Sequence, residues 1–231
     1  MKNEVSKNTS DVNMARRSFL RYAGAGVAGM GLLATAASCH KDHGINPFGG
    51  PVDVGSGDIG ILNYAYALEQ LEAAFYTQVI KTPYAGMSTY ERVSLTSIRD
   101  HEVAHREFFK AALGAKAIKG LTVDFSSINF KSRDSVLAAA AAFEDLGVTA
   151  YDGVGYLIQN VDYLVTAGKI VSVEARHAAF IRSLIMPGTD YFATAPQLDA
   201  STSVNISNVP SAVLAGANTY LVTKVTAKSF A

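Results

Sequence analysis

The feature that most constrains this chain is a pair of Glu-x-x-His motifs, each on the apolar side of a predicted helix. The motifs are Glu102–His105 in "EVAH" and Glu174–His177 in "EARH". Residues three apart on a helix share one face, so each motif directs a carboxylate and an imidazole to the same place. Buried charges are unfavourable unless they are paired or bound to a metal. A fold that accepts both motifs must therefore supply partners for them in its interior.

Four segments carry the helical period of apolar residues, and acidic or histidine side chains interrupt each apolar stripe. The expected helices span about residues 58–82, 88–113, 134–158 and 162–185. A capping box of Ser88 and Glu91 marks the start of the second helix. A solvated charge normally lies opposite the apolar face. Glu69 in the first helix and Glu144 in the third instead lie on that face, as the two motifs do.

The connections between these helices differ in length. The first two helices are joined by "TPYAGMS" and the last two near "QNV", whereas "GAKAIKGLTVDFSSINFKSR" between the second and third has no clear helix. Two hairpins joined by one long crossover predict an all-α, antiparallel four-helix bundle over residues 58–186. The polar tail, residues 187–231, allows one short helix from Pro210 to about Leu221, and we assign it no chemistry.

The two hairpins are related by an internal repeat. "ALEQLEAAFY" (67–76) resembles "AFEDLGVTAY" (142–151), which pairs Glu69 with Glu144, and "EVAH" matches "EARH". The midpoint between Glu69 and Glu102 falls in "PYAG", and that between Glu144 and Glu174 falls beside "QN". Because a helix rises by about 1.5 Å per residue, the acidic residues of each hairpin are expected at the same level. Each hairpin therefore offers one Glu and one Glu-x-x-His to the interior.

Together the hairpins supply a set of carboxylates and imidazoles that can hold metal ions. The predicted ligands are Glu69, Glu102, His105, Glu144, Glu174 and His177. The four carboxylates can neutralise two divalent ions, and a mixed oxygen and nitrogen set suits iron or manganese better than a closed structural zinc site. Bridging carboxylates would hold both ions close enough to share an oxygen species. Such a set permits two-electron chemistry with O₂ or peroxide.

Three further residues near this set have two interpretations each. Glu72 lies one helical turn from Glu69 and could be an extra metal ligand. Its counterpart in the repeat is Gly147, and a capping or interhelix hydrogen bond is the favoured role of Glu72. Tyr76 and Tyr151 could be redox-active or could bond to the ligand carboxylates. Core packing or support of the ligands is the interpretation that we favour for both tyrosines.

The remaining histidines and the single cysteine offer little for other kinds of site. His101 points about 100° away from Glu102 on the helix and is expected at the surface. His40 and His43 lie in a Gly- and Pro-rich stretch, where histidines usually have no role, although they could grip a stray metal. One cysteine permits no intrachain disulfide and no Cys₄ metal site. A formal net charge of zero gives nucleic-acid binding no electrostatic support.

The first 57 residues are predicted to lie outside the bundle. "ARRSFLRYAGAGVAGMGLLATAASC" places Arg16 and Arg17 before a weakly apolar, Gly-rich stretch, which resembles a twin-arginine export signal over residues 1–38. The stretch is short and rich in glycine, so a permanent transmembrane span is the poorer interpretation. "TAASC" resembles a bacterial lipobox, with Cys39 as the lipidated residue, and ordinary cleavage near Ala34–Ala36 is the alternative.

This interpretation of the N-terminus predicts where the protein works. Residues 39–57 are expected to form a flexible tether between Cys39 and the bundle. Export by the twin-arginine route would place the bundle in the periplasm. A lipid on Cys39 would in addition anchor the protein to a membrane as a lipoprotein.

From about Asp58 to Leu184 the chain resembles the ferritin-like superfamily of ferritins, bacterioferritins and rubrerythrins. "LEQLEAAFY" and "VEARHAA" are most similar to the exported bacterial ferritin-like proteins related to plant desiccation-related proteins. The resemblance implies a ferritin-like bundle with a long crossover between its second and third helices. It also implies that the six ligands named above hold a dinuclear iron or manganese centre. Rubrerythrin's additional iron–cysteine domain has no counterpart in this sequence, and no defined reaction carries over from this branch.

Three functions are compatible with this resemblance. The first is a di-metal oxidoreductase outside the cytoplasm, ferroxidase-like or peroxidase-like, that acts on Fe(II), O₂ or peroxide. Twin-arginine export supports it, because that route is associated with proteins that fold around a cofactor before transport. The second is iron storage in a cage, which a lipid tether on each subunit makes awkward. The third is a structural or stress-protective bundle whose metal site is vestigial.

Overall fold

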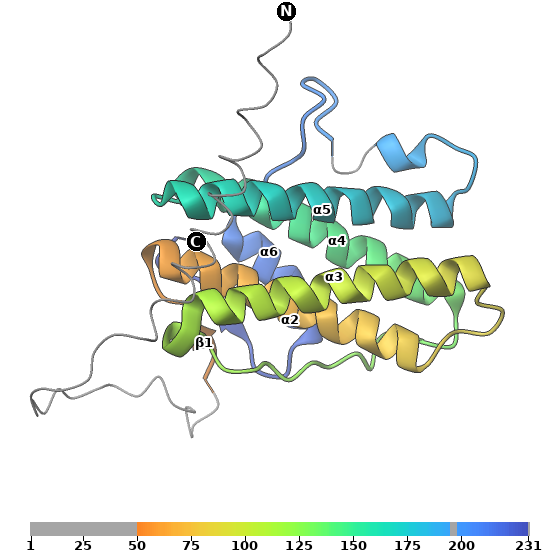
Figure 1. Ribbon diagram of the computed structural model, residues 1–231, viewed down its shortest axis with the longest axis horizontal. Coiled ribbons are helices and arrows are strands. Elements are labelled where there is room, and N and C mark those ends of the chain that lie inside the picture. The colour runs from red at the N-terminus through yellow and green to blue at the C-terminus, as the bar shows by residue number, and fades with distance from the viewer. Residues whose placement is uncertain (1–49, 195–197, 231) are drawn as a thin grey trace, which may run out of the picture. The chain divides into compact units, whose positions relative to one another are not determined.

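The computed structural model describes residues 50–194 and 198–230. Within this part of the chain, four long helices form two hairpins, which confirms the predicted all-α bundle (Figure 1). The four helices are α2 (Gly57–Lys81), α3 (Thr89–Leu113), α4 (Arg133–Val154) and α5 (Val161–Ile185). The predicted export signal, Cys39, His40 and His43 lie outside the described residues.

Local sequence signals determine where these helices begin and end. The Ser88 hydroxyl accepts a hydrogen bond from Glu91 N at 3.1 Å, and Glu91 Oε2 accepts one from Ser88 N at 2.9 Å. The predicted capping box therefore starts α3. The Asn160 side chain accepts hydrogen bonds from the first backbone N–H groups of α5. Gly114 follows α3 with a φ of +54°, a conformation that favours glycine.

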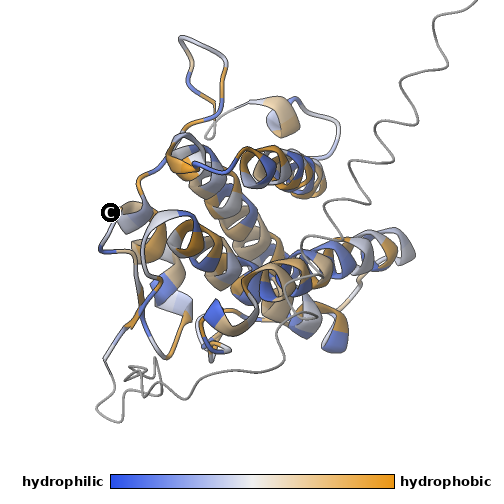
Figure 2. Cartoon of the chain, turned by 60° about the vertical axis from the view of Figure 1, so that its left-hand side comes forward, coloured by the Kyte–Doolittle hydropathy of each residue, from blue (hydrophilic) through white to orange (hydrophobic). Residues whose placement is uncertain are grey.

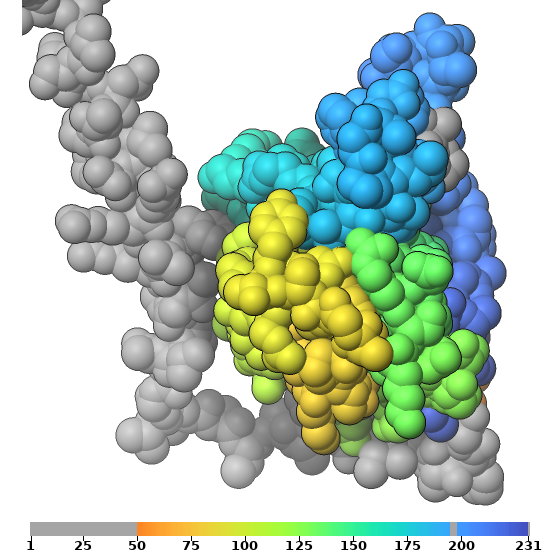
Figure 3. All heavy atoms as spheres, turned by 90° about the vertical axis from the view of Figure 1, so that its right-hand side faces the viewer, coloured from red at the N-terminus to blue at the C-terminus, as the bar shows by residue number. Residues whose placement is uncertain are grey.

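Arg133 defines how the second hairpin lies against the first. Its Nε donates to Glu91 Oε1 at 2.7 Å, and its Nη2 donates to the carbonyl oxygen of Leu184 at 2.8 Å. The start of α4 therefore lies beside the start of α3 and the end of α5. The crossover after α3 must return along the length of the bundle before α4 can begin. Figure 3 views this end, where the end of α2, the start of α3 and the crossover pack together.

The buried polar side chains of α2 hold the segments that pass alongside it. Asn63 Nδ2 donates to the carbonyl oxygens of Val54 and Lys116, at 3.2 and 3.0 Å. Gln70 Oε1 accepts a hydrogen bond from Leu121 N at 2.7 Å. Most of α2 is buried on all sides, as expected of a helix that is apolar around most of its circumference. The crossover is therefore tied to the same helix that carries Glu69.

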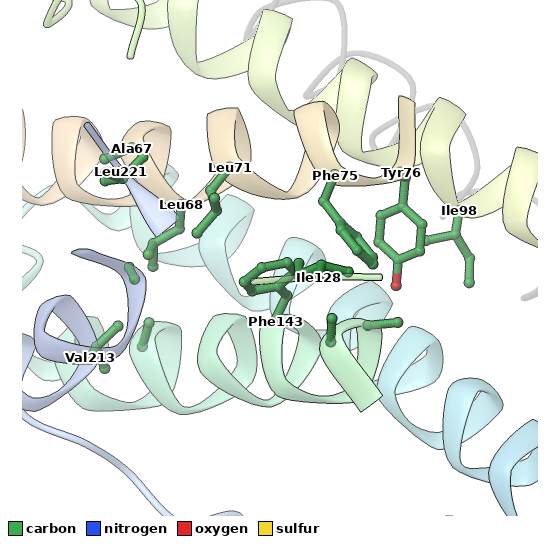
Figure 4. Packing of buried hydrophobic residues seen from close by; sticks show 14 of the residues in the cluster. Ala67, Leu68, Leu71, Phe75, Tyr76, Ile98, Ile128, Phe143, Val213 and Leu221 are labelled. Carbon is green, nitrogen blue, oxygen red and sulfur yellow. The ribbon is translucent and has the colours of Figure 1, made fainter. Parts of the chain in front are cut away.

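The main core lies between α2 and α4 (Figure 4). Leu71 and Phe75 of α2 face Phe143 of α4 there. The rings of Phe75 and Phe143 meet edge to face with their centroids 4.9 Å apart, an arrangement that aromatic rings prefer. In Figure 2 the bundle helices carry hydrophobic and hydrophilic residues on different sides. This packing sets the separation of the two helices that carry Glu69 and Glu144.

The C-terminal segment contributes to the core, for which the sequence offered no role. Helix α6 (Pro210–Ala217) packs against α4. Val213, Leu214 and Leu221 are all buried, and they belong to the same cluster as the core of the bundle. The expected polar tail after Pro187 therefore includes a stretch that covers the outer side of α4.

A short parallel pairing joins the two ends of the described chain. Strand β1 (Val52–Asp53) lies beside β2 (Val225–Thr226). Val52 N donates to the carbonyl oxygen of Lys224 at 2.7 Å, and Val54 is buried. Residues 39–57 were expected to be a flexible tether, and this expectation is wrong for the part from Val52 onward. That part is held by backbone hydrogen bonds to the C-terminal segment.

The third helix of the bundle ends earlier than its apolar pattern predicts. α4 stops at Val154, and a short 3₁₀ turn follows it instead of the expected continuation to residue 158. The 3₁₀ turns of the described chain are Gly114–Lys116, Gly155–Leu157, Tyr191–Ala193 and Asn218–Tyr220. Among the helices of the described residues, none is both long and apolar enough to cross a membrane.

Gly153 provides a test of the packing between α4 and the C-terminal segment. A Cβ at this position would lie 1.9 Å from the carbonyl oxygen of Asn208, whose own N–H donates to Thr149 O at 3.1 Å. We expect Gly153→Ala to lower the free energy of unfolding by about 1–3 kcal/mol, although alanine favours a helix over glycine by about 1 kcal/mol. Urea unfolding followed by circular dichroism would measure it.

Gly155→Ala is the matched control for this prediction. A Cβ at Gly155 would have no neighbour within 4 Å, and its φ of −53° suits alanine. We expect this variant to be as stable as the wild type or slightly more stable. Equal stability of the two variants would contradict the close approach of Asn208 to α4.

Candidate metal centre

The structure brings all six predicted ligands together in the middle of the bundle. They form two overlapping groups, each with ligand atoms within 4.8 Å of one another. One group is Glu69, Glu102, His105 and Glu174, and the other is Glu102, Glu144, Glu174 and His177. Each of the four helices α2 to α5 contributes at least one of these residues. Glu102 and Glu174 belong to both groups, so they lie between the other ligands.

The carboxylates of this cluster are completely shielded from solvent. Glu69, Glu102, Glu144 and Glu174 are each 0% exposed. The side chain of His177 is 6% exposed and that of His105 is 14% exposed, so the cluster approaches solvent at its imidazoles. Ionised groups in such a position require a partner of opposite charge.

The ligand atoms left without a hydrogen bond indicate which carboxylates could bridge two ions. Among the described residues, no hydrogen bond reaches either oxygen of Glu102 or of Glu174. In Glu69 and Glu144 only Oε2 lacks a hydrogen bond. Nδ1 of each imidazole lacks one as well. A carboxylate with two available oxygens can contact two ions, whereas one with a single available oxygen suits one ion. Glu102 and Glu174 could therefore each contact two ions, and Glu69 and Glu144 could each contact one.

Two tyrosines occupy the other oxygens of Glu69 and Glu144. The Tyr151 hydroxyl of α4 donates to Glu69 Oε1 on α2, with a distance of 2.5 Å. The Tyr76 hydroxyl of α2 donates to Glu144 Oε1 on α4, and in Figure 4 it points away from α2 across the core. Each hairpin thus orients the single Glu of the other. Because Oε1 is taken, Oε2 is the oxygen that each of these carboxylates presents to the cluster.

The imidazole nitrogens approach carboxylate oxygens from different helices. His105 Nδ1 is 2.9 Å from Glu174 Oε1, and His177 Nδ1 is 2.8 Å from Glu102 Oε1. Among the described residues neither Nδ1 is aligned for a hydrogen bond, despite these short distances. The imidazole nitrogens and the carboxylate oxygens lie close together, but no hydrogen bond joins them. This is the arrangement expected of donors that share a metal ion.

A comparison with protein families matches residues 57–187 to the ferritin-like domain. The chain belongs to the ferritin-like domain family. The match begins at the first residue of α2 and ends just beyond α5, so it contains the whole cluster. This confirms the predicted membership of the ferritin-like superfamily. A comparison with curated proteins found no match.

Within the ferritin-like domain, burial and mutual charge alter the pKa values of the cluster. Burial would lower the pKa of His105 and of His177, but the surrounding carboxylates raise both to about 12. Burial would raise the pKa of Glu102, but the two imidazoles lower it to about 2. Burial raises the pKa of Glu144 to about 8 and that of Glu69 well above its usual value. Protons therefore offset part of the negative charge in the metal-free protein.

Glu72 is a fifth buried carboxylate in the ferritin-like domain, next to the cluster. It is 3% exposed, and its Oε1 lies 3.0 Å from where a Cβ of Gly147 would be. Glu174 Oε2 is 3.8 Å from the same point, so Glu72 lies near a carboxylate shared by both groups. Burial, followed by the charge of Glu174, raises the pKa of Glu72 well above its usual value.

The structure explains why Glu72 has no acidic partner in the repeat. Gly147 leaves the space that the Glu72 carboxylate occupies, and a Cβ at Gly147 would make a tight contact of 3.0 Å with Glu72 Oε1. The hydrogen-bonding role that the sequence analysis favoured for Glu72 stays a prediction. The alternative role of Glu72 as an extra ligand stays a prediction.

His101 is a neighbour of the cluster that the sequence analysis missed. It is exposed, as predicted, yet its Nδ1 lies 2.9 Å from Nε2 of His177. The prediction judged His101 only by its angle to Glu102. A signal was available, because His101 lies four residues before His105 and so shares a helix side with one of the ligands.

The pKa values of the cluster predict how the stability of the metal-free protein depends on pH. The folded state holds protons on Glu144, His105 and His177 that the unfolded chain releases near its usual pKa values of 4.5 and 6.5. Between pH 6.5 and 8 the folded state therefore binds more protons than the unfolded chain. We expect the free energy of unfolding to fall by about 1 kcal/mol or more per pH unit in this window.

Urea unfolding of chelator-treated protein at several pH values would measure this slope. The depressed pKa of Glu102 adds no slope here, because that carboxyl is ionised in both states above pH 4.5. Glu144→Gln removes one titrating group and should flatten the slope. A free energy of unfolding that rises from pH 6.5 to 8 would contradict the raised pKa values of Glu144, His105 and His177.

Proposed function

We propose that this ferritin-like protein binds a dinuclear iron or manganese centre and reacts with O₂ or peroxide, or oxidises Fe(II). The observation that carries the proposal is the overlap of the two ligand groups at Glu102 and Glu174. Two carboxylates with both oxygens available support a pair of neighbouring ions better than a single one. Four carboxylates also balance the charge of about two divalent ions.

The chemistry of the ligands supports iron or manganese. Six oxygen atoms and two imidazole nitrogens lack hydrogen bonds from the described residues and are available to metal. Hard, carboxylate-rich sets with imidazole suit iron and manganese, whereas structural zinc favours a closed tetrahedral set of four ligands. A pair of such ions supplies two-electron redox chemistry when it is bound.

The protein's own residues would orient the ligands and restrict access. Tyr76 and Tyr151 each hold one terminal carboxylate in a fixed orientation through a hydrogen bond. The carboxylates have no contact with solvent, and His105 is the ligand nearest to it. A site closed in this way is compatible with small species such as Fe(II), O₂ or peroxide. It gives no support for a large organic substrate.

The proposal includes a location outside the cytoplasm. It rests on the twin-arginine-like signal over residues 1–38 and on Cys39 in "TAASC", both outside the described residues. A lipid on Cys39 would leave the bundle attached to a membrane through the residues that precede β1. Labelling with a radioactive fatty acid in the native host, compared with Cys39→Ala, would test the anchor.

Metal content is the decisive test of the proposed centre. Protein purified from its native host should contain iron or manganese at about two ions per chain. Loading with Fe(II) under anaerobic conditions, followed by exposure to air, should produce an optical change that requires both metal and O₂. Absence of both iron and manganese from the native protein would overturn the proposal. A sizing column would separate it from iron storage, because a cage requires a large closed assembly.

The shared carboxylates predict the effect of single substitutions. Glu102→Gln and Glu174→Gln each remove one negative charge that both ligand groups use. We expect either change to reduce the metal bound per chain by at least half and to abolish the O₂-dependent optical change. Metal analysis after dialysis would measure this loss, and circular dichroism would check that the helices remain.

Glu107→Gln is the control for these variants, because Glu107 lies on the same helix as Glu102 but its side chain is 51% exposed. It should bind metal as the wild type does. If the Glu102 and Glu174 variants also retain full metal content and reactivity, the metal does not bind at these two shared carboxylates.

A further inference from the structure

The exposed ring of His101 and the buried ring of His177 are joined edge to edge. His101 Nδ1 and His177 Nε2 are 2.9 Å apart. The two ring planes differ by 12°, and their centroids are 5.2 Å apart. A short contact between nitrogens of nearly parallel rings at this centroid distance is the geometry of an in-plane hydrogen bond, not of two stacked faces. The contact links α3 to α5.

The direction of this hydrogen bond follows from the opposite side of the His177 ring. His177 Nδ1 faces the carboxylates and is 2.8 Å from Glu102 Oε1. For Nδ1 to bind a metal it must carry a lone pair, so the proton of the neutral ring must be on Nε2. His177 Nε2 then donates to His101 Nδ1, and His101 carries its own proton on Nε2.

We propose that His101 is a positioning residue for the metal centre, which holds the ring of His177 with Nδ1 directed at the carboxylates. The inference rests on the proposed metal-binding function. Partners of this kind fix the tautomer and the orientation of a ligand histidine, and their loss lowers metal affinity by about 10- to 100-fold. His101 acts through its contact with His177 and is not itself a metal ligand.

The repeat gives only one of the two imidazoles such a partner. The residue that corresponds to His101 in the second hairpin is Val173, which has no acceptor in its side chain. No hydrogen bond from the described residues reaches His105 Nε2, and the His105 side chain is 14% exposed. Before metal arrives, His177 has contacts at both ring nitrogens, whereas His105 contacts carboxylates at Nδ1. The ligand group that contains His177 should therefore bind the first metal ion, and the group with His105 the second.

Three variants test this assignment in anaerobic titrations with Co(II), a spectroscopic substitute for Fe(II). His101→Leu removes the acceptor at an exposed position, and we expect it to weaken the first binding step by about 10- to 100-fold. His101→Gln offers an amide oxygen to His177 Nε2 and should restore most of that affinity. Val173→His places an imidazole at the corresponding site and is the matched variant for the second step. Isothermal calorimetry would give both affinities, and the Co(II) absorption bands would report on the ligand geometry.

The outcomes separate positioning from a merely structural role. Loss of affinity in His101→Leu with an unchanged urea midpoint, together with recovery in His101→Gln, supports the proposal. Wild-type affinity in His101→Leu would overturn it. Weakening of both steps together with a lower urea midpoint, and without recovery in His101→Gln, would also overturn it, because a general loss of structure would then explain the effect.

A nuclear magnetic resonance measurement distinguishes failure of this inference from failure of the proposed function. The His177 Nε2–H signal should be visible and slow to exchange in the wild type, with or without Zn(II), and it should be lost in His101→Leu. If the wild type binds no metal, the proposed function fails, and this signal still decides whether His101 holds His177. A rapidly exchanging His177 Nε2–H in the wild type would overturn the positioning role even if the protein binds metal.

Discussion

Four carboxylates buried in the middle of one bundle are the constraint on which the rest of the structure depends. Each is 0% exposed, and a buried charge without a partner is strongly destabilising. Two imidazoles can offset only part of this charge, and the raised pKa of Glu144 indicates that protons offset more of it in the metal-free protein. Divalent cations would replace those protons. The burial of this set is therefore understandable as preparation for metal, and it is costly in any other role.

The same constraint explains how the four helices are joined. α2 packs against α3, α4 packs against α5, and the aromatic core joins α2 to α4. Between α3 and α5 the contacts include those of the cluster itself, such as His105 with Glu174 and His101 with His177. Occupation of the cluster would therefore tighten the contact between α3 and α5. Metal binding and the final packing of α3 against α5 are thus linked, as expected where ligands come from separate helices.

Most of the candidate centre could be predicted from the sequence because its signals are local and repeated. Apolar stripes interrupted by Glu69 or by a Glu-x-x-His motif can be recognised from the sequence alone. The positions of the turns then place the acidic residues of each hairpin at the same level. The pairing of β1 with β2 could not be found in this way, because strands of two residues have no period and these lie far apart in sequence. His101 was placed correctly at the surface, but its ring reaches across to α5. Its partner could be identified only once the two hairpins had been placed against each other.

The two hairpins are alike in their ligands and unlike in what surrounds them. Glu72 and His101 belong to the first hairpin, and the repeat puts Gly147 and Val173 at the corresponding positions of the second. Both residues act across the interface, since Glu72 fills the space over Gly147 and His101 holds the ring of His177. A duplicated hairpin would by itself give two equivalent metal positions. Substitutions beside the ligands make the two positions differ while the ligand set itself stays symmetrical. In the proposed centre, such a difference would let one ion be retained while the other is exchanged, as reaction with Fe(II) requires.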